Sequence, residues 1–185
     1  MKQLIQITNK NILKLFLIAS LIFIISACGD DSNPTDNNND NNLTTSTLKL
    51  DGDGFSNKSV SAEAAVATYA SVTQMTIISV SYNEDIQMLI YVKGNKTGTY
   101  TFETINNDGL ENGISITSGT GQTAKYYLWN NQSGSIKISS YGSVGGKVSG
   151  TFTGKLYNVA TEAEVTISGS FSAMRTVDVP TSGLN

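Results

Sequence analysis

The chain has 185 residues, which suits one ordinary domain, and only 15% of them are charged. A formal net charge of −3 provides no basic face for nucleic acid and no general attraction to anionic lipid. A single Cys and the absence of His exclude an intrachain disulfide, histidine catalysis and imidazole metal ligands, so we expect no nucleic-acid partner, metal or cofactor.

Residues 1–27 have the order of a secretory signal peptide. Three lysines precede an almost wholly apolar run at 15–25, and small residues follow it. A helix over that run would span roughly 16 Å, which is too short for a hydrocarbon core of about 30 Å. A transmembrane anchor that extends back to Ile12 is the alternative, but it would place Lys14 in the bilayer.

The end of this signal, Ile25-Ser26-Ala27-Cys28, resembles the lipobox of bacterial lipoproteins. In that family the chain is cut before the Cys, whose sulfur receives a diacylglycerol and whose new amino group can be acylated. The resemblance implies palmitate-type lipidation of Cys28 and a membrane partner through the anchor. Two or more acyl chains anchor a protein stably, whereas one binds only marginally. An ordinary secreted protein with a chance Cys is the alternative.

An Asn- and Asp-rich segment follows, and with Cys28 it makes up a tether at 28–46. Leu43 is its only large apolar residue, so we expect the segment to stay disordered. Such a coil spans about 20–25 Å on average. Asp-rich runs just after a lipidated Cys resemble the surface-export signals of Bacteroidota lipoproteins, and Gly29 leaves outer-membrane sorting open in that resemblance. We expect an envelope lipoprotein of the outer membrane, exposed at the surface; a plain solvated spacer is the alternative.

The region 47–178 is predicted to be one all-β domain, and 179–185 a C-terminal tail. Short β-like runs separated by Gly, Asn and Asp clusters predict an antiparallel β-sandwich or flattened barrel of roughly 8–11 strands. Residues 63–70 are Ala-rich and could instead form a short helix. The expected strands are Thr47–Leu50, Ser56–Val60, Val66–Tyr69, Gln74–Tyr82, Ile86–Lys93, Gly98–Glu103, Gly113–Thr117, Ala124–Asn130, Ser135–Tyr141, Lys147–Asn158 and Val165–Arg175.

The last two expected strands each alternate apolar and hydroxyl-bearing residues and share a Gly-x-Phe pattern. We predict an antiparallel hairpin whose paired residue numbers sum to 321. In this register Phe152 faces Gly169, and Phe171 faces Gly150. Each ring would then cover the bare backbone of the facing glycine.

The order of these motifs resembles a group of uncharacterised Bacteroidota lipoproteins with a β-rich domain. The motifs are Asp53-Gly54-Phe55, Gly98-Thr99-Tyr100, Gly134-Ser135-Ile136-Lys137-Ile138 and the two Gly-x-Phe strands. The resemblance covers most of 47–175. It implies an antiparallel β fold and no known activity.

The sequence Asp51-Gly-Asp53-Gly begins like a calcium-binding loop. An EF-hand then requires Asp or Asn at the fifth position, Gly at the sixth and Glu at the twelfth. Phe55, Ser56 and Ala62 stand there instead. We therefore interpret this segment as a tight turn that leads into the next strand.

Close pairs of carboxylates are the remaining candidates for catalysis, because glycoside hydrolysis uses two of them. The pairs are Glu84 with Asp85 and Glu162 with Glu164, and both lie at predicted turns, where charge is ordinarily solvated. No motif selects a Ser–Lys nucleophile. We expect no catalytic residues, and an envelope hydrolase is the less favoured alternative.

An aromatic strand provides the candidate ligand platform. Alternation places Tyr127 and Trp129 on one face, beside Asn130 and Asn131. If that face is exposed, two rings with polar neighbours suit a glycan or a protein partner. The alternative is that Trp129 belongs to the core and Tyr126 packs at an edge.

These features predict a lipid-anchored, non-enzymatic lipoprotein that acts as a binding or accessory module in the cell envelope. Its partner would be an envelope protein or a glycan. A lipocalin-like carrier of a small apolar ligand is the alternative, and it requires a hollow barrel.

Overall fold

The computed structural model describes residues 45–106, 109–176 and 178–179. The predicted signal peptide, Cys28, almost all of the tether and most of the C-terminal tail lie outside the described residues and stay predictions. Within the described ranges, no helix is long and apolar enough to cross a membrane.

The described part of the chain contains ten β-strands and one short 3₁₀ helix, η2 (Gly121–Thr123). The prediction of an all-β fold is therefore confirmed. The strands are β1 (Thr47–Gly52), β2 (Phe55–Ala70), β3 (Met75–Tyr82), β4 (Ile86–Lys93), β5 (Gly98–Thr101), β6 (Gly113–Ser118), β7 (Lys125–Leu128), β8 (Gly134–Tyr141), β9 (Lys147–Asn158) and β10 (Glu164–Arg175).

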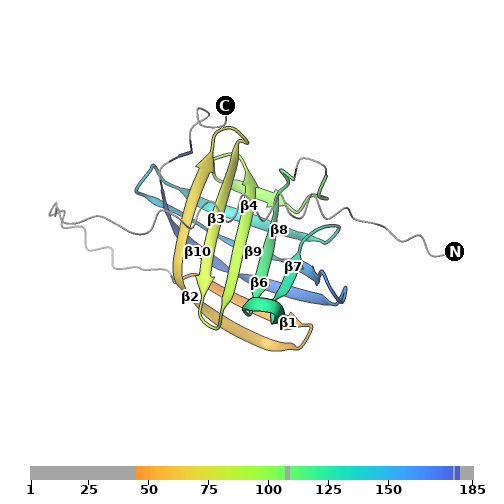
Figure 1. Ribbon diagram of the computed structural model, residues 1–185. Helices are drawn as coiled ribbons and strands as arrows, with labels where there is room; N and C mark the ends of the chain where they lie inside the picture. Colours follow the sequence, from red (N-terminus) through yellow and green to blue (C-terminus); the bar gives the residue numbers. More distant parts are fainter. Residues whose placement is uncertain (1–44, 107–108, 177, 180–185) are drawn as a thin grey trace. The chain divides into compact units, whose positions relative to one another are not determined.

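Eight of these strands close into an antiparallel barrel (Figure 1). Around the barrel the order is β1, β2, β3, β4, β6, β7, β9 and β10, and β10 pairs back onto β1. A short parallel contact also joins β10 to β2 near Met174 and Val66. Of the two expected architectures, the structure is the barrel, in which closure removes the exposed strand edges.

The two remaining strands extend the sheet beyond the barrel. One edge of β9 pairs with β8 over most of its length and with β7 only at Tyr157 and Asn158. The strand β5 then pairs with the outer edge of β8. The barrel is consequently sealed between β7 and β9 by a contact close to the β9–β10 turn.

One expectation at the N-terminal side of the domain was wrong. Residues 56–60 and 66–69 belong to one continuous 16-residue strand, β2, and the helical alternative at 63–70 is not adopted. The first half of β2 pairs with β1 and the second half with β3, with a register shift between Ala62 and Ala64. Hydrogen bonds to two successive partners outweigh the helix preference of the alanines.

The hairpin of β9 and β10 has the predicted register. Phe152 pairs with Gly169 and Phe171 with Gly150, so both pairs sum to 321. A Cβ atom on either glycine would lie 2.7 Å from the ring of the facing phenylalanine. The aromatic cover of the glycines is therefore confirmed.

The barrel interior is filled by apolar side chains. Met88, Ile90 and Ile114, from neighbouring strands, have no surface that a water-sized sphere could touch. The same holds for Leu156 and Ile167 in the β9–β10 hairpin. Burial of this kind stabilises a fold by about 25 cal/mol for each Å² of apolar surface removed from water.

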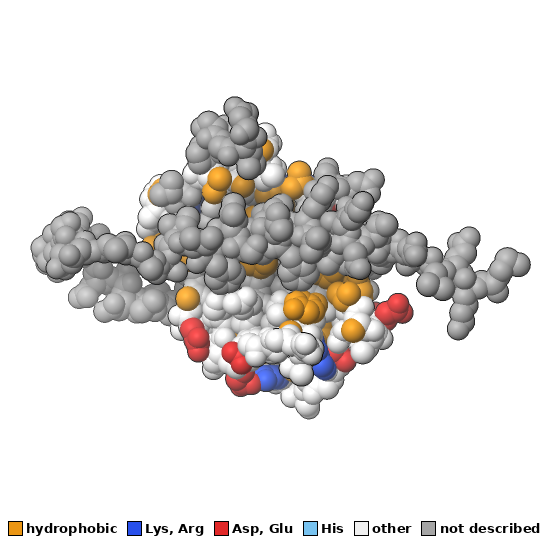
Figure 2. Space-filling model, viewed as in Figure 1, with side chains coloured by type: hydrophobic (Ala, Val, Ile, Leu, Met, Phe, Trp, Pro, Cys, Tyr) orange, Lys and Arg blue, Asp and Glu red, His pale blue; other side chains and the backbone are white. Residues whose placement is uncertain are grey.

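The barrel has two ends with different turns. The Asp53 end carries the β1–β2, β3–β4, β6–β7 and β9–β10 connections, and the Arg175 end carries the β2–β3 and β8–β9 turns and the end of β10. In the view of Figure 2, acidic and basic side chains gather over the lower end, where Figure 1 shows η2 and the β1–β2 hairpin. The charged side chains that are visible on this face therefore lie toward the Asp53 end.

Candidate functional site

A hollow of about 300 Å³, open to solvent, lies at the Asp53 end of the barrel. Three connections form its wall: the β1–β2 turn, the β3–β4 turn and the β6–β7 connection that contains η2. A hydrogen bond from the Gly119 amide to the Asp85 carbonyl (3.0 Å) joins two of them. The lining residues are Asp53, Gly54, Phe55, Glu84, Ser118, Gly119, Thr123 and Lys125.

The carboxylate of Asp53 is a junction at this end of the barrel, because it connects the β1–β2 turn to β7 and β9 by hydrogen bonds. Its Oδ2 atom accepts hydrogen bonds from the Tyr127 hydroxyl and the Asn158 amide nitrogen, both at 2.8 Å. Lys125 Nζ lies 3.4 Å from the same oxygen and donates to the Asp53 carbonyl at 3.2 Å. One side chain in the β1–β2 turn thus holds β7 and β9, which is where the barrel closes.

The turn geometry explains how Asp53 reaches these partners. Asp53 and Gly54 both have positive φ, at 45° and 88°, as in the type I′ turns that connect twisted hairpins. The interpretation of this segment as a tight turn is confirmed. Asp51 closes the turn from the other side, because its Oδ1 atom accepts a hydrogen bond from the Asn57 amide at 3.1 Å.

The surroundings of Asp53 favour an ionised Asp53 carboxylate next to a neutral Tyr127 hydroxyl. Hydrogen bonds from Asn158 and Tyr127, together with the charge of Lys125, hold the pKa of Asp53 below its ordinary value. Burial and the adjacent carboxylate raise the pKa of Tyr127. At neutral pH Asp53 is therefore ionised and accepts, while Tyr127 is protonated and donates.

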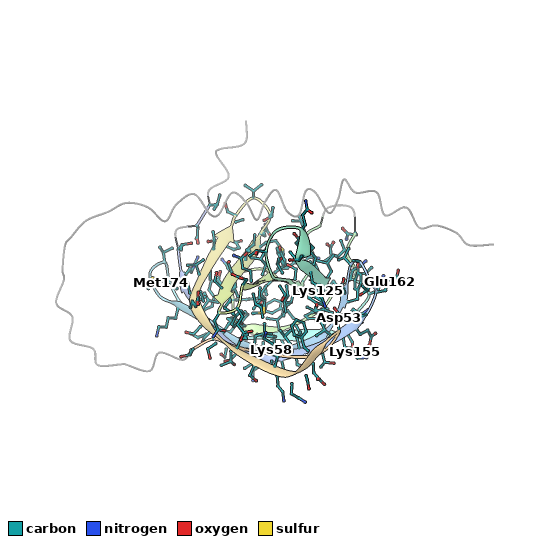
Figure 3. All side chains as sticks on the ribbon, turned by 60° about the horizontal axis from the view of Figure 1, so that its bottom comes forward. Asp53, Lys58, Lys125, Lys155, Glu162 and Met174 are labelled. Atoms are coloured by element: carbon teal, nitrogen blue, oxygen red, sulfur yellow. The ribbon has the colours of Figure 1, made fainter. Side chains whose placement is uncertain are left out.

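Asp53 and Lys125 also line the hollow. Asp53 Oδ1 accepts no hydrogen bond from the described residues, and the side chain is 14% exposed. The side chain of Lys125 is 48% exposed. Figure 3 shows both residues together, with Met174 on the far side of the barrel. An acceptor and a donor thus stand beside the Phe55 ring and the Thr123 hydroxyl.

Three of the four paired carboxylates lie in the connections between strands, as predicted, and the fourth, Glu164, begins β10. Glu84 and Asp85 form the β3–β4 turn, where Glu84 makes an ion pair with Lys58. Glu162 lies in the β9–β10 turn, and Glu164, at the start of β10, is 2.8 Å from Lys155. All four carboxylates are exposed, so none has the buried setting that prepares a general acid.

The predicted aromatic platform does not form, because both of its rings are buried. Tyr127 is 0% and Trp129 1% exposed, and the Trp129 indole donates to the Glu103 carbonyl at 2.9 Å. Gly113 makes room for the indole, since a Cβ there would lie 2.1 Å from the ring. Asn130 accepts from the Ile105 amide, and Asn131 is an exposed turn residue with φ 58°.

The structure instead confirms the alternative for this strand. Trp129 belongs to the core, and Tyr126, at 40% exposure, lies at the surface. Tyr127 pairs with Ile116, which pairs with the buried Met88, so Tyr127 lies on the inward face of β7. Trp129 follows the end of β7 and packs against the Tyr91 ring, with 5.4 Å between the ring centroids.

Comparison with protein families, with curated proteins and with solved structures found no match for this chain. Within the described ranges, no three Asp, Glu, His or Cys side chains come together as a metal site requires. The candidate site therefore consists of the hollow and the residues around Asp53.

Sequence analysis did not select Phe55, Lys125 and Asn158 for this site. Phe55 follows the turn that contains Asp53, but the other two come from β7 and β9, more than 70 residues further along the chain. Only the barrel closure brings them together, and no local motif signals it.

Proposed function

We propose that this protein is a lipid-anchored lipoprotein of the bacterial cell envelope, in the outer membrane, and a non-enzymatic binding module. The lipobox at Cys28 supports the anchor. The hollow beside Asp53 and Lys125 carries the binding function, because it places a partly exposed acceptor and an exposed donor next to an aromatic ring.

A glycan is the ligand class that suits this hollow. Sugar hydroxyls both donate and accept, so one hydroxyl can donate to Asp53 Oδ1 while another accepts from Lys125 Nζ. Phe55 supplies an apolar surface for the C–H face of a sugar ring, and Ser118 and Thr123 add hydroxyls. We propose a short saccharide of the cell envelope or its surroundings as the ligand.

The filled interior argues against the lipocalin-like alternative. A carrier holds its ligand among the inward-facing side chains of an unfilled barrel. Here Val80, Met88 and Ile116 from three neighbouring strands are at most 2% exposed. Binding at the Asp53 end requires no such space.

Titration with saccharides tests the binding function. Residues 28–185, labelled with ¹⁵N, are mixed with a panel of mono- and disaccharides, and amide shifts are followed by NMR. We expect saturable shifts at Gly54 and Thr123 for at least one sugar. Lys125→Ala should weaken that binding about tenfold, because it removes one charge-assisted hydrogen bond.

Lys155→Ala is the matched control. Lys155 is 49% exposed, ion-paired and at the same end of the barrel, but it does not line the hollow. It should leave the affinity unchanged. Absence of saturable shifts at the hollow, or equal loss in both variants, would contradict a glycan site there.

A further inference from the structure

The largest exposed apolar side chains of the described chain concentrate at the Arg175 end. Val72 lies in the β2–β3 turn, Val144 in the β8–β9 turn, and Met174 and Val179 at the end of β10 and just beyond it. Their exposed fractions are 48%, 50%, 60% and 50%, in that order. The turns of a barrel are ordinarily polar, so a group of exposed apolar side chains at one end indicates a contact surface there.

Hydrogen bonds connect the segments that carry these side chains. The Gly145 amide donates to the Arg175 carbonyl at 2.9 Å, and the Arg175 amide donates to the Gly146 carbonyl at 2.7 Å, which fixes the β8–β9 turn beside β10. The Val179 carbonyl accepts from the Ser71 amide and hydroxyl, at 3.2 and 2.9 Å. The apolar residues therefore belong to one connected rim.

The charges around this rim suit a lipid surface. Arg175 pairs with Asp178 at 2.8 Å and lies over the Tyr141 ring, so its charge is neutralised within the end itself. Lys96 and Lys147 are exposed and make no ion pair among the described residues. Apolar tips flanked by lysines and tyrosines are typical of groups that insert at the headgroup level.

The chain also enters the barrel on this side. The Ser172 amide donates to the Ser46 hydroxyl at 2.9 Å, so Ser46 lies two residues, roughly 7 Å, along β10 from Met174. From there β1 runs toward Gly52 at the Asp53 end. Cys28 precedes Ser46 by only 18 residues.

We propose that the Arg175 end is the membrane-facing end of the barrel. Val72, Val144, Met174 and Val179 rest on the surface of the bilayer that holds the lipid of Cys28, so this inference rests on the proposed anchor. A short tether keeps the barrel at a high effective concentration next to the bilayer, so four partly inserted side chains suffice to bias its orientation. The hollow beside Asp53 then points away from the lipid.

Paramagnetic broadening measures this orientation directly. Residues 28–185 contain the whole described barrel and one thiol, so Cys28 can be coupled to a maleimide lipid in phosphatidylcholine nanodiscs that contain a gadolinium-chelating lipid. Amides of Val72 and Val144 should broaden more than those of Gly54 and Glu84. We expect about a tenfold excess of the Arg175-end-down orientation, which corresponds to about 1.4 kcal/mol.

Two variants make the result specific. Combined replacement of Val72, Val144 and Met174 by serine should abolish the difference in paramagnetic broadening between the two ends of the barrel. Val159→Ser, which changes a 39% exposed valine in the β9–β10 turn at the Asp53 end, should leave it unchanged. Equal broadening at both ends, or stronger broadening at the Asp53 end, would overturn the proposal. Because the lipid is attached chemically, either result is independent of whether cells lipidate Cys28.

Discussion

Replacement of Asp53 by alanine is expected to lower the free energy of unfolding by about 3 kcal/mol or more. It leaves the Tyr127 hydroxyl and the Asn158 amide, on residues 0% and 2% exposed, without their acceptor. An unsatisfied buried donor costs about 1–3 kcal/mol. The positive φ of Asp53 adds about 1–2 kcal/mol for a residue with a Cβ and no polar side chain. Chemical denaturation followed by circular dichroism measures the loss.

Three further variants separate these contributions. Asp53→Gly removes the acceptor but tolerates positive φ, so it should be more stable than Asp53→Ala. Asp53→Asn keeps an acceptor and also tolerates positive φ, so it should lose only about 1–2 kcal/mol. Lys125→Ala breaks a half-exposed ion pair and should cost at most about 1 kcal/mol. If Asp53→Ala cost no more than Lys125→Ala, the carboxylate would not be the junction of this end.

The same carboxylate gives stability a defined dependence on pH. Hydrogen bonds from Asn158 and Tyr127 hold its folded-state pKa below the ordinary value of 3.8. A group whose pKa is lowered on folding stabilises the fold above the unfolded-state pKa, and that stability is lost as pH falls through the folded-state pKa. The difference in stability between the wild type and Asp53→Asn should therefore shrink below pH 3.8 and stay constant above it.

Replacement of Gly169 by alanine is expected to cost about 3 kcal/mol or more, at or above the upper end of the usual overpacking range. A Cβ at this position would lie 2.0 Å from the Thr47 carbonyl oxygen and 2.7 Å from the Phe152 ring. The ring can turn, but the carbonyl belongs to β1, which pairs with β10 from Thr47 to Gly52. The variant must therefore separate the two strands. Thermal and chemical denaturation both report the loss.

Gly98→Ala is the matched control for the glycine prediction. Gly98 also lies in a strand, β5, but a Cβ there would be 3.5 Å from its nearest neighbour, the Tyr100 ring. This variant should change stability by no more than about 0.5 kcal/mol, as surface substitutions usually do. A Gly169→Ala variant as stable as Gly98→Ala would show that β1 and β10 are not in close contact.

The local sequence pattern was enough to predict the hairpin of β9 and β10. Alternation fixes which side of each strand is buried, and the Gly-x-Phe repeats fix how the two strands align, so Phe152 and Gly169 could be paired from sequence. The turn at Asp53 could also be predicted from the local sequence, because Asp-Gly favours positive φ. Both features depend on residues that are close in the chain.

The candidate site could not be predicted in this way because it depends on closure. Which face of β7 points inward is decided by β6 and β9, and alternation alone leaves both faces of Tyr126–Trp129 possible. Once Tyr127 faces the interior, its hydroxyl requires an acceptor, and the structure supplies it from Asp53, 74 residues earlier. Asn158 reaches the same oxygen across 105 residues. Pairings this distant leave no local signal in a single sequence.

Lipid attachment to Cys28 is tested most directly by metabolic labelling. Bacteria that express the full chain are fed an alkyne analogue of palmitate, and the wild type is compared with Cys28→Ala by in-gel fluorescence, detergent-phase partitioning and mass spectrometry. We predict a labelled wild type in the detergent phase whose first residue is lipid-modified Cys28, and an unlabelled variant that retains residues 1–27. An unlabelled wild type, or a variant that still carries label, would contradict a lipid-anchored binding module.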